Sequence, residues 1–274
     1  MADAEALTKD WWRTSIIEMR PGVIRFAGYP IEDLIGRISF VQMIWLMTRG
    51  ELPSRAQGEL LEAALTAGVD HGPQAPSIAI ARMAATCGVG LNNAIASALN
   101  VLGDVHGGAG EQTVELFHAI AERQARGEAQ DAAVDAALDE FTAQRGKFIP
   151  GYGHRFHPID PRAPRLLELV DAAASAGVVD GRFARIGRAV EAALAVRKGG
   201  KRIPMNIDGA TAVIYAELGF PAPLARGLFC LSRAVGILAH AWEQTQQGGR
   251  NKGPIPRQFI PTYDGPGARR FPEC

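Results

Sequence analysis

The segment SFVQMIWLMTRGELP, residues 39–53, contains the start, the buried face and the end of one amphipathic helix. Ser39 is a residue type that caps helix amino termini, and Gly50 followed by Pro53 is a typical helix stop. Between them, apolar residues recur three to four positions apart, at Phe40, Ile44 and Met47. Because this spacing is the period of an α-helix and not of a strand, the segment predicts a helix with one buried face.

The same period recurs over most of the chain. We expect further helices over residues 57–67, 76–102, 110–126, 131–144, 162–176, 183–197 and 208–218, with Asp208 as the amino-terminal cap of the last one. Two short runs with β-branched residues, 15–19 and 23–26, flank Pro21-Gly22 and predict a small hairpin near the amino terminus. Since no series of alternating strands follows, we predict an all-α fold.

Composition limits the partners and the compartment. The 274 residues are 47% hydrophobic and 21% charged, and 29 basic residues balance 29 acidic ones. A neutral globular chain lacks the charge excess that binds nucleic acids or anionic membranes, so we expect neither as a partner. Three cysteines and six histidines without metal-ligand spacing argue against a metal site and against structural disulfides, and favour a reducing cytoplasm.

Targeting signals are not expected either. The first residues lack the basic and apolar regions of a signal peptide. The longest apolar run, residues 224–242, is interrupted by Arg226, Ser232 and Arg233. This pattern predicts a buried helix and not a membrane span.

Glycines surround two of the histidines. His106 lies in GDVHGGAGEQ, residues 103–112, where four glycines let backbone approach a ligand closely and supply amide groups for an oxyanion. A tight turn that caps a helix would explain the same pattern. His154 lies in PGYGHRFHPIDPR, residues 150–162, with Arg155 and Arg162 close behind it. An imidazole beside guanidinium groups suits a carboxylate or phosphate ligand, while a proline-rich loop with surface arginines is the simpler alternative.

Other segments offer further charged groups. Asp208, in NIDGATAVIYAELGFP, places a carboxylate at the start of an apolar helix, where capping and action as a base are compatible. A stripe of basic residues recurs every seven positions on the last helix, at Arg226, Arg233 and His240. Such a stripe is either the solvated face of the helix or part of a cleft that binds acids. His71, in VDHGPQAPS, either contacts a substrate or satisfies a buried turn.

Taken in chain order, these segments resemble the citrate synthase superfamily. The resemblance covers nearly the whole chain and is carried by TSIIEMRPGVIRFAGYPIEDLIG, SFVQMIWLMTRGELPS, VDHG, VHGGAGE, PGYGHRFHPIDPRAPR, NIDGATAVIYAELGFP and LSRAVGILAHAWEQ. Each motif alone is weak, and their order is the specific signal. The resemblance implies a citrate synthase-like helical fold with an amino-terminal hairpin and two domains, residues 1–107 with 220–274 and residues 108–219.

The resemblance also implies catalytic roles. His106 matches the histidine that hydrogen-bonds the thioester oxygen of acetyl-CoA, and His154 matches the one that polarises the oxo-acid carbonyl. Asp208 matches the base that removes the methyl proton. Because that methyl group is a far weaker acid than a carboxylic acid, a base and an oxyanion donor must act together.

Binding residues carry over in the same way. The resemblance assigns substrate carboxylates to Arg162, Arg233 and His71. It assigns the CoA adenine to the loop that contains Gly151, Tyr152, Gly153 and Arg155. The tail departs from the family, because many synthases have arginine before proline where this chain has Ile255-Pro256. The cations available to substitute are Arg257, Arg250 and Lys252.

The combination of VDHGPQAPS with LGDVHGG resembles citryl-CoA lyase and the carboxy-terminal module of ATP citrate lyase, and the chain is shorter than typical complete citrate synthases. We therefore expect cleavage of citryl-CoA to acetyl-CoA and oxaloacetate, with His154 accepting the hydroxyl proton and Asp208 returning a proton to the enol. The first alternative is a synthase that condenses acetyl-CoA, or another acyl-CoA, with oxaloacetate or another 2-oxo acid.

An alternative from another class is a CoA-binding scaffold without catalytic activity. For the enzyme, no permanently bound cofactor is expected, since coenzyme A thioesters are substrate or product. The family implies a homodimer or a higher homo-oligomer.

Overall fold

The computed structural model describes residues 8–9, 11–256 and 258–272, and in these residues the chain is helical apart from one small sheet. The all-α prediction is therefore confirmed. The strands are β1 (Ile17–Arg20), β2 (Val23–Phe26) and β3 (Tyr29–Pro30). The helices are α2 (Ile31–Leu34), α3 (Phe40–Arg49), α4 (Arg55–Gly68), α5 (Pro76–Thr86), α6 (Leu91–Leu99), α7 (Ala109–Ala125), α8 (Gln130–Arg145), α9 (Arg162–Ser175), α10 (Arg182–Arg197), α11 (Ile207–Glu217) and α12 (Ala222–Gln246).

Two compact units share the chain. The first comprises Met1–Asp70 and Leu102–Arg233, and the second comprises His71–Val101 and Ala234–Cys274. The domain boundaries implied by the resemblance, 1–107 with 220–274 and 108–219, stay a prediction.

The amino-terminal hairpin and the helix after it follow the sequence signals. Strands β1 and β2 pair antiparallel, with Ile17 opposite Phe26. At the start of α3 the side chain of Ser39 accepts a hydrogen bond from the amide of Gln42, and the Gln42 side chain accepts from the amide of Ser39. Gly50 closes the helix with a φ of 78°, a left-handed conformation that glycine adopts without strain. The hairpin and the two ends of the helix are confirmed. The predicted buried face at Phe40, Ile44 and Met47 was wrong in detail, because the buried residues of α3 are Trp45 and Leu46 and Phe40 is 80% exposed.

Two helix predictions were wrong in detail. The single helix expected over residues 76–102 is two helices, α5 and α6, because Gly88 takes a φ of +85° between them. Apolar residues at helical spacing continue on both sides of the break and hide it in the sequence. The cap of α11 is Asn206 and not Asp208, since the Asn206 side chain accepts from the amides of Asp208 and Gly209.

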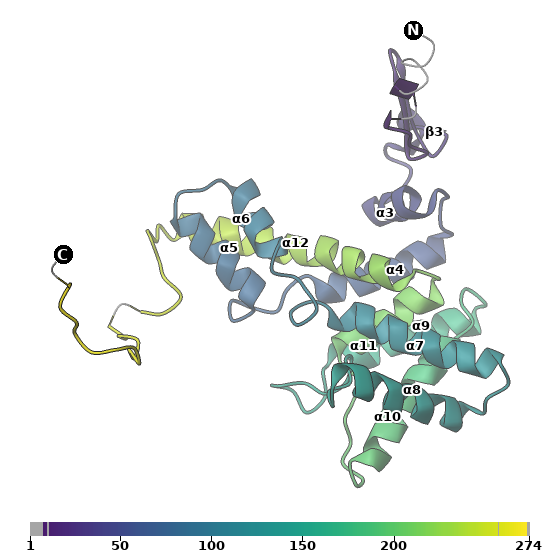
Figure 1. Cartoon of the computed structure of the whole chain (residues 1–274). Helices are drawn as coiled ribbons and strands as arrows, with labels where there is room; N and C mark the ends of the chain where they lie inside the picture. The colour runs from purple at the N-terminus through teal and green to yellow at the C-terminus, as the bar shows by residue number, and fades with distance from the viewer. Residues whose placement is uncertain (1–7, 10, 257, 273–274) are drawn as a thin grey trace. The chain divides into compact units, whose positions relative to one another are not determined.

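Helix α11 forms the centre of the first unit. Every residue from Gly209 to Ala216 is buried, and a helix that is apolar all round must be covered on all sides. Figure 1 shows α7, α8, α9, α10 and α11 gathered together, in teal and green, and α11 packs most extensively on α7, α9 and α10. Whatever chemistry the start of α11 carries is therefore held on a rigid element.

The second unit has its own smaller core. It is made of small and β-branched side chains from α5, α6 and the carboxy-terminal part of α12: Ala75, Ile78, Ala81, Ala94, Ala98, Ile237 and Ala241. The alanines let the helix backbones approach closely.

Within the described residues, α12 is the one helix long and apolar enough to cross a membrane by length and composition. Its first half makes the contacts of a core helix. The buried Ser232 hydroxyl donates to the carbonyl of Leu65, and the buried Arg233 Nε donates to the carbonyl of Gly68 at 3.1 Å.

One close backbone contact joins the segment before His154 to the start of α11. The carbonyl of Gly151 accepts from the amide of Asn206 at 2.9 Å, and the amide of Gly153 donates to the carbonyl of Pro204 at 2.7 Å. A Cβ at Gly209 would overlap the Gly151 carbonyl, and a Cβ at Gly151 would lie 2.9 Å from the Cα of Gly209. Only two glycines allow this approach.

We expect Gly209→Ala to lower the free energy of unfolding by about 1–3 kcal/mol, because the new methyl group would force the two backbones apart. Gly227→Ala in α12 is the matched control, since a Cβ there meets nothing within 4 Å. The free energy of unfolding of Gly227→Ala should equal that of the wild type or exceed it slightly, because alanine favours a helix more than glycine does. Denaturant unfolding checks both variants, and equal midpoints for Gly209→Ala and the wild type would contradict the role of the contact.

Candidate active site

Asp208 is the second residue of α11, and its carboxylate does not serve as the cap. Asn206 satisfies the first amides of the helix, with its Oδ1 at 2.9 Å from the amide of Asp208 and 3.3 Å from that of Gly209. The Asn206 Nδ2 also donates to the carbonyl of Gly153 at 2.7 Å. One side chain thus caps the helix and ties it to the segment that leads to His154.

Opposing influences set the protonation of Asp208. Burial raises the pKa of the Asp208 carboxyl, the cations Arg233 and Arg162 lower it in part, and the nearby Asp160 carboxylate raises it again. The net result is a pKa above the ordinary value of an aspartate. A carboxyl group with a raised pKa exchanges protons more readily near neutral pH.

His154 is held by backbone donors. Its Nδ1 accepts hydrogen bonds from the amides of Phe156 and His157, each at 3.1 Å. In the neutral ring the proton is therefore on Nε2. Burial lowers the pKa of His154, as do His157 and Arg162, while Asp160 raises it, and the net shift is downward. A neutral ring with Nε2 protonated favours the role of a donor to a substrate oxygen over that of a proton acceptor.

His106 lies in a tight loop between α6 and α7. The carbonyl of His106 accepts from the amide of Gly103 at 2.9 Å. A Cβ at Gly108 would lie 2.7 Å from the Cα of Asp104, so the loop closes on itself at a glycine. Burial, and secondarily Arg233, lowers the pKa of His106. The imidazole is therefore neutral at neutral pH, the form suited to hydrogen-bonding an oxygen without adding a charge.

Two arginines connect these groups electrostatically. Arg233 is 6% exposed, lies over the Phe229 ring at 4.8 Å, and influences both His106 and Asp208. Arg162 is the first residue of α9 and influences both His154 and Asp208. In the described part of the first unit, two guanidinium groups thus act on one carboxyl and two imidazoles, Arg233 on His106 and Asp208 and Arg162 on His154 and Asp208.

The remaining predicted binding residues differ in setting. Tyr152 is buried, and its hydroxyl donates to the carbonyl of Gly187 at 2.8 Å, so its side chain anchors the loop. The backbone of Gly151 and Gly153 is bonded to the segment before α11, and Arg155 is exposed. His71 belongs to the second unit. Arg257 lies outside the described residues.

Sequence reasoning missed Asn206 and Asp160. Asn206 occupies the capping position, and the asparagine two residues before Asp208 was the available signal. Asp160 is buried and bonded to Arg162 through both carboxylate oxygens, each at 2.9 Å. The signal was an aspartate just before Pro161, which was grouped with surface loop residues.

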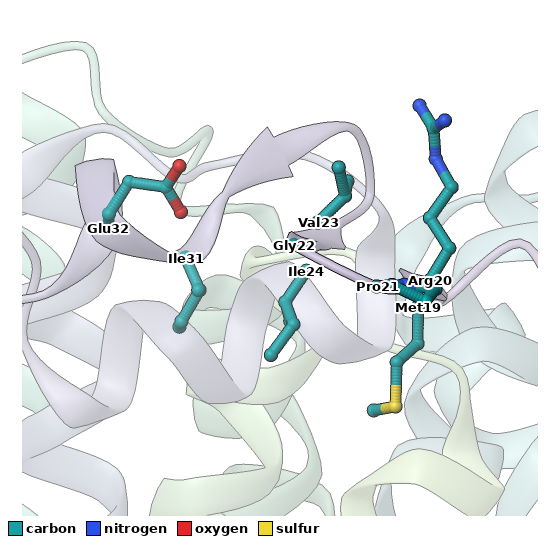
Figure 2. Close-up of a pocket in the computed structure, with 8 residues that line it drawn as sticks. All are labelled: Met19, Arg20, Pro21, Gly22, Val23, Ile24, Ile31 and Glu32. Carbon is teal, nitrogen blue, oxygen red and sulfur yellow. The ribbon is translucent and has the colours of Figure 1, made fainter.

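A separate hollow lies on the amino-terminal hairpin (Figure 2). It has a volume of about 410 Å³ and is lined by residues 19–24, Ile31 and Glu32. Met19, Ile24 and Ile31 point to one side of the hairpin, while Arg20 and Glu32 point to the other. It holds none of the predicted site residues.

Known proteins resemble the chain in sequence. The family model described as citrate synthase, C-terminal domain, matches residues 5–68 and 55–257. A citrate synthase of Acidithiobacillus ferridurans is 30% identical over 99% of this chain and 69% of its own length. A citrate synthase of Haloferax volcanii is 29% identical over 78% of this chain and 53% of its own. The chain thus spans between half and about two thirds of the length of these synthases.

Solved structures agree on the fold. The citryl-CoA lyase of Hydrogenobacter thermophilus superposes with a TM-score of 0.82 at 32% identity, over 95% of this chain and 97% of that one. The ATP citrate lyase of Methanothrix soehngenii, solved with citrate and coenzyme A, gives a TM-score of 0.76 at 21% identity over 44% of its length, which shows the fold alone. The citrate synthase-like fold predicted from the motifs is confirmed, and the chain belongs to the citrate synthase family.

Proposed function

We propose that the chain cleaves citryl-CoA to acetyl-CoA and oxaloacetate. The supporting observation is the likeness to the Hydrogenobacter thermophilus citryl-CoA lyase, which extends over 97% of that chain. The synthases named above are matched over smaller shares of their own length. The likeness to the lyase thus extends over nearly the whole of both chains.

In this reaction the bond between the hydroxyl-bearing carbon and the acetyl methylene carbon breaks. The hydroxyl proton passes to a water molecule retained in the site. His154 donates its Nε2 proton in a hydrogen bond to the hydroxyl oxygen and stabilises the negative charge that this oxygen then carries, until the charge leaves it as the ketone forms and the carbon-carbon bond breaks. The two backbone bonds at Nδ1 support this donor role. It replaces the acceptor role expected from the sequence, because the neutral ring has no free lone pair on Nε2.

The released electron pair makes an enolate of acetyl-CoA. His106 donates to the thioester oxygen, where the negative charge collects, and Asp208 returns a proton to the methylene carbon to give the methyl group. A positioned acid or base contributes ~10²–10⁴-fold and an oxyanion donor ~10²–10³-fold. The pKa of Asp208 is raised by its burial, which favours the protonated form that this donation requires.

Binding residues complete the proposal. Arg162 and Arg233 hold the carboxylates of the oxaloacetate part, with His71 and Arg257 as further contacts. The loop with Gly151, Tyr152, Gly153 and Arg155 holds coenzyme A, which is a substrate or product and not a resident cofactor. Closure of the two predicted domains, 1–107 with 220–274 and 108–219, excludes water. We assign the protein to the cytoplasm, where the thiols of Cys87 and Cys230, unpaired within the described residues, stay reduced.

A synthase is the second candidate. The curated relatives in sequence are citrate synthases, of which that of Acidithiobacillus ferridurans aligns over 99% of this chain. The same three residues serve condensation, with Asp208 as the base that removes the methyl proton. The directions differ in water access and in relative binding of citryl-CoA.

Activity assays of the purified protein distinguish the lyase from the synthase. With citryl-CoA we expect rapid release of oxaloacetate, followed with malate dehydrogenase. With acetyl-CoA and oxaloacetate we expect no free CoA, followed with a thiol reagent. Free CoA in the second assay would favour the synthase. Saturable CoA binding without turnover of either substrate would favour the scaffold.

Asp208→Ala should lower the turnover rate by ~10²-fold or more, because it removes the proton donor. CoA binding should stay intact, because the substitution removes no binding group. The matched control is Asp171→Ala in α9, whose exposed carboxylate pairs with Arg188. Near-normal activity of Asp208→Ala would remove Asp208 from its role.

The burial of the Asp208 carboxyl should make the folded protein less stable as the pH rises. Because the pKa of Asp208 is raised on folding, the folded protein binds more protons than the unfolded chain between the ordinary pKa of about 3.9 and the raised value. The free energy of unfolding then falls as the pH rises through this window. Asp208→Asn should remove that loss and raise the melting temperature at pH 7. An equal or lower melting temperature would contradict the burial of this charge.

We also propose a homodimer or higher homo-oligomer. On α12, Val235, Leu238 and Trp242 are 59%, 43% and 56% exposed and share one helical face. Trp242→Glu should shift light-scattering mass toward the monomer, since it places a charge on that apolar face. Gln144→Glu, at an exposed position of α8, should not. An active wild-type monomer would refute the proposed assembly.

A further inference from the structure

Asp160 is a buried carboxylate whose bonds all lead to the candidate site. It is 1% exposed. Its Oδ1 accepts from the backbone amide of Arg162 at 3.1 Å and from the Arg162 Nε at 2.9 Å. Its Oδ2 accepts from the Arg162 Nη2 at 2.9 Å and from the amide of Ile207 at 3.0 Å. These four bonds use the accepting capacity of a carboxylate.

The bonds join separate elements of the first unit. Arg162 begins α9, and Ile207 begins α11 directly before Asp208. Asp160 itself belongs to the loop that carries His154 six residues earlier. Because a buried charge is costly unless it is paired and hydrogen-bonded, this arrangement has little freedom to shift.

We propose that Asp160 is a positioning residue, which fixes the Arg162 guanidinium and the amino terminus of α11 against the His154 loop, and so sets the geometry of Asp208 and His154 for reaction. The inference rests on the proposed function for the reaction that it serves. It assigns no chemical step to Asp160, because the carboxylate is bonded on both oxygens to protein groups and acts through Arg162 and Ile207.

The alternative is that Asp160 and Arg162 form a purely structural ion pair. A variant that removes the charge of Asp160 distinguishes this alternative from a positioning role. Asp160, His157 and Arg162 are described groups whose charges act on His154, and the Asp160 carboxylate acts to raise the pKa of His154. Asp160→Asn keeps the shape, removes the charge and replaces one acceptor by a donor. A purely structural role predicts lower stability with an unchanged kcat, whereas a positioning role predicts a lower kcat at a nearly unchanged KM; the titration of His154 reports whether the Asp160 charge acts on this ring.

The first test is a titration that needs no substrate. In nuclear magnetic resonance spectra of the full chain, the His154 ring signals of Asp160→Asn should titrate at lower pH than in the wild type. His118, which lies on α7 against Phe183, is an internal reference that should not move. Asp171→Asn, which removes an exposed carboxylate bonded to Arg188 at 3.0 and 2.6 Å, should leave both histidines unchanged.

The second test is kinetic. With the substrate that the wild type turns over, Asp160→Asn should lower kcat by ~10²-fold with little change in the KM of the thioester, because misplaced groups lose rate and not CoA contacts. Asp171→Asn should retain wild-type kinetics. An unchanged kcat in a folded Asp160→Asn would overturn the inference, whatever the titration of His154 shows.

Two controls keep the outcomes distinct. If the wild type turns over no substrate, the proposed function fails, and the titration still decides whether Asp160 controls His154. If Asp160→Asn does not fold, Asp160→Glu takes its place, since it keeps the charge but displaces the carboxylate from Arg162 and Ile207. Wild-type kcat in a folded Asp160→Glu would then overturn the positioning role, and a reduced kcat at an unchanged KM and melting temperature would support it.

Discussion

The close approach of two glycine backbones is the constraint on which the candidate site depends. Gly151 and Gly209 leave no room for a Cβ between the loop that precedes His154 and the first turn of α11. Asn206 bonds to both segments beside this contact. Its backbone amide and its Nδ2 donate to the carbonyls of Gly151 and Gly153, and its Oδ1 accepts from the amide of Asp208. Since α11 is buried on all sides, the loop is attached to the most rigid part of the first unit.

Burial and the neighbouring arginines shift the pKa values of the titratable groups in the candidate site. Burial alone would neutralise both the imidazoles and the carboxyl, and it does lower the pKa values of His106 and His154 and raise that of Asp208. Arg233 and Arg162 counteract the effect on Asp208, so the carboxyl stays within reach of ionisation. Neutral donors next to a carboxyl of raised pKa form a set that can polarise an oxygen and move a proton at carbon.

Much of the fold was predictable from local signals. Ser39 and Gly50 bound α3 as expected, because capping and left-handed glycine depend on few neighbours. The break between α5 and α6 was not predicted, since apolar spacing continues through Gly88 and only the packing of the alanines on both sides reveals the turn. The division of the chain into domains was drawn from family resemblance and stays a prediction.

For the candidate site, the sequence identified chemical groups but not their partners. His106, His154 and Asp208 stood out through the glycines and helix start around them. The partners, Asn206 and Asp160, act across tens of residues, and a single sequence carries no record of such contacts. The tautomer of His154 was also beyond prediction, because it depends on the direction of two backbone amides in the following turn.

A crystal structure of the protein with coenzyme A and citrate bound tests the central claim most directly. The proposed reaction predicts the thiol end of CoA beside His106 and Asp208, and the hydroxyl oxygen of citrate at about 2.6–3.2 Å from the Nε2 of His154. Ligands bound away from these three side chains, or side chains too far apart to reach one ligand after domain closure, would contradict it.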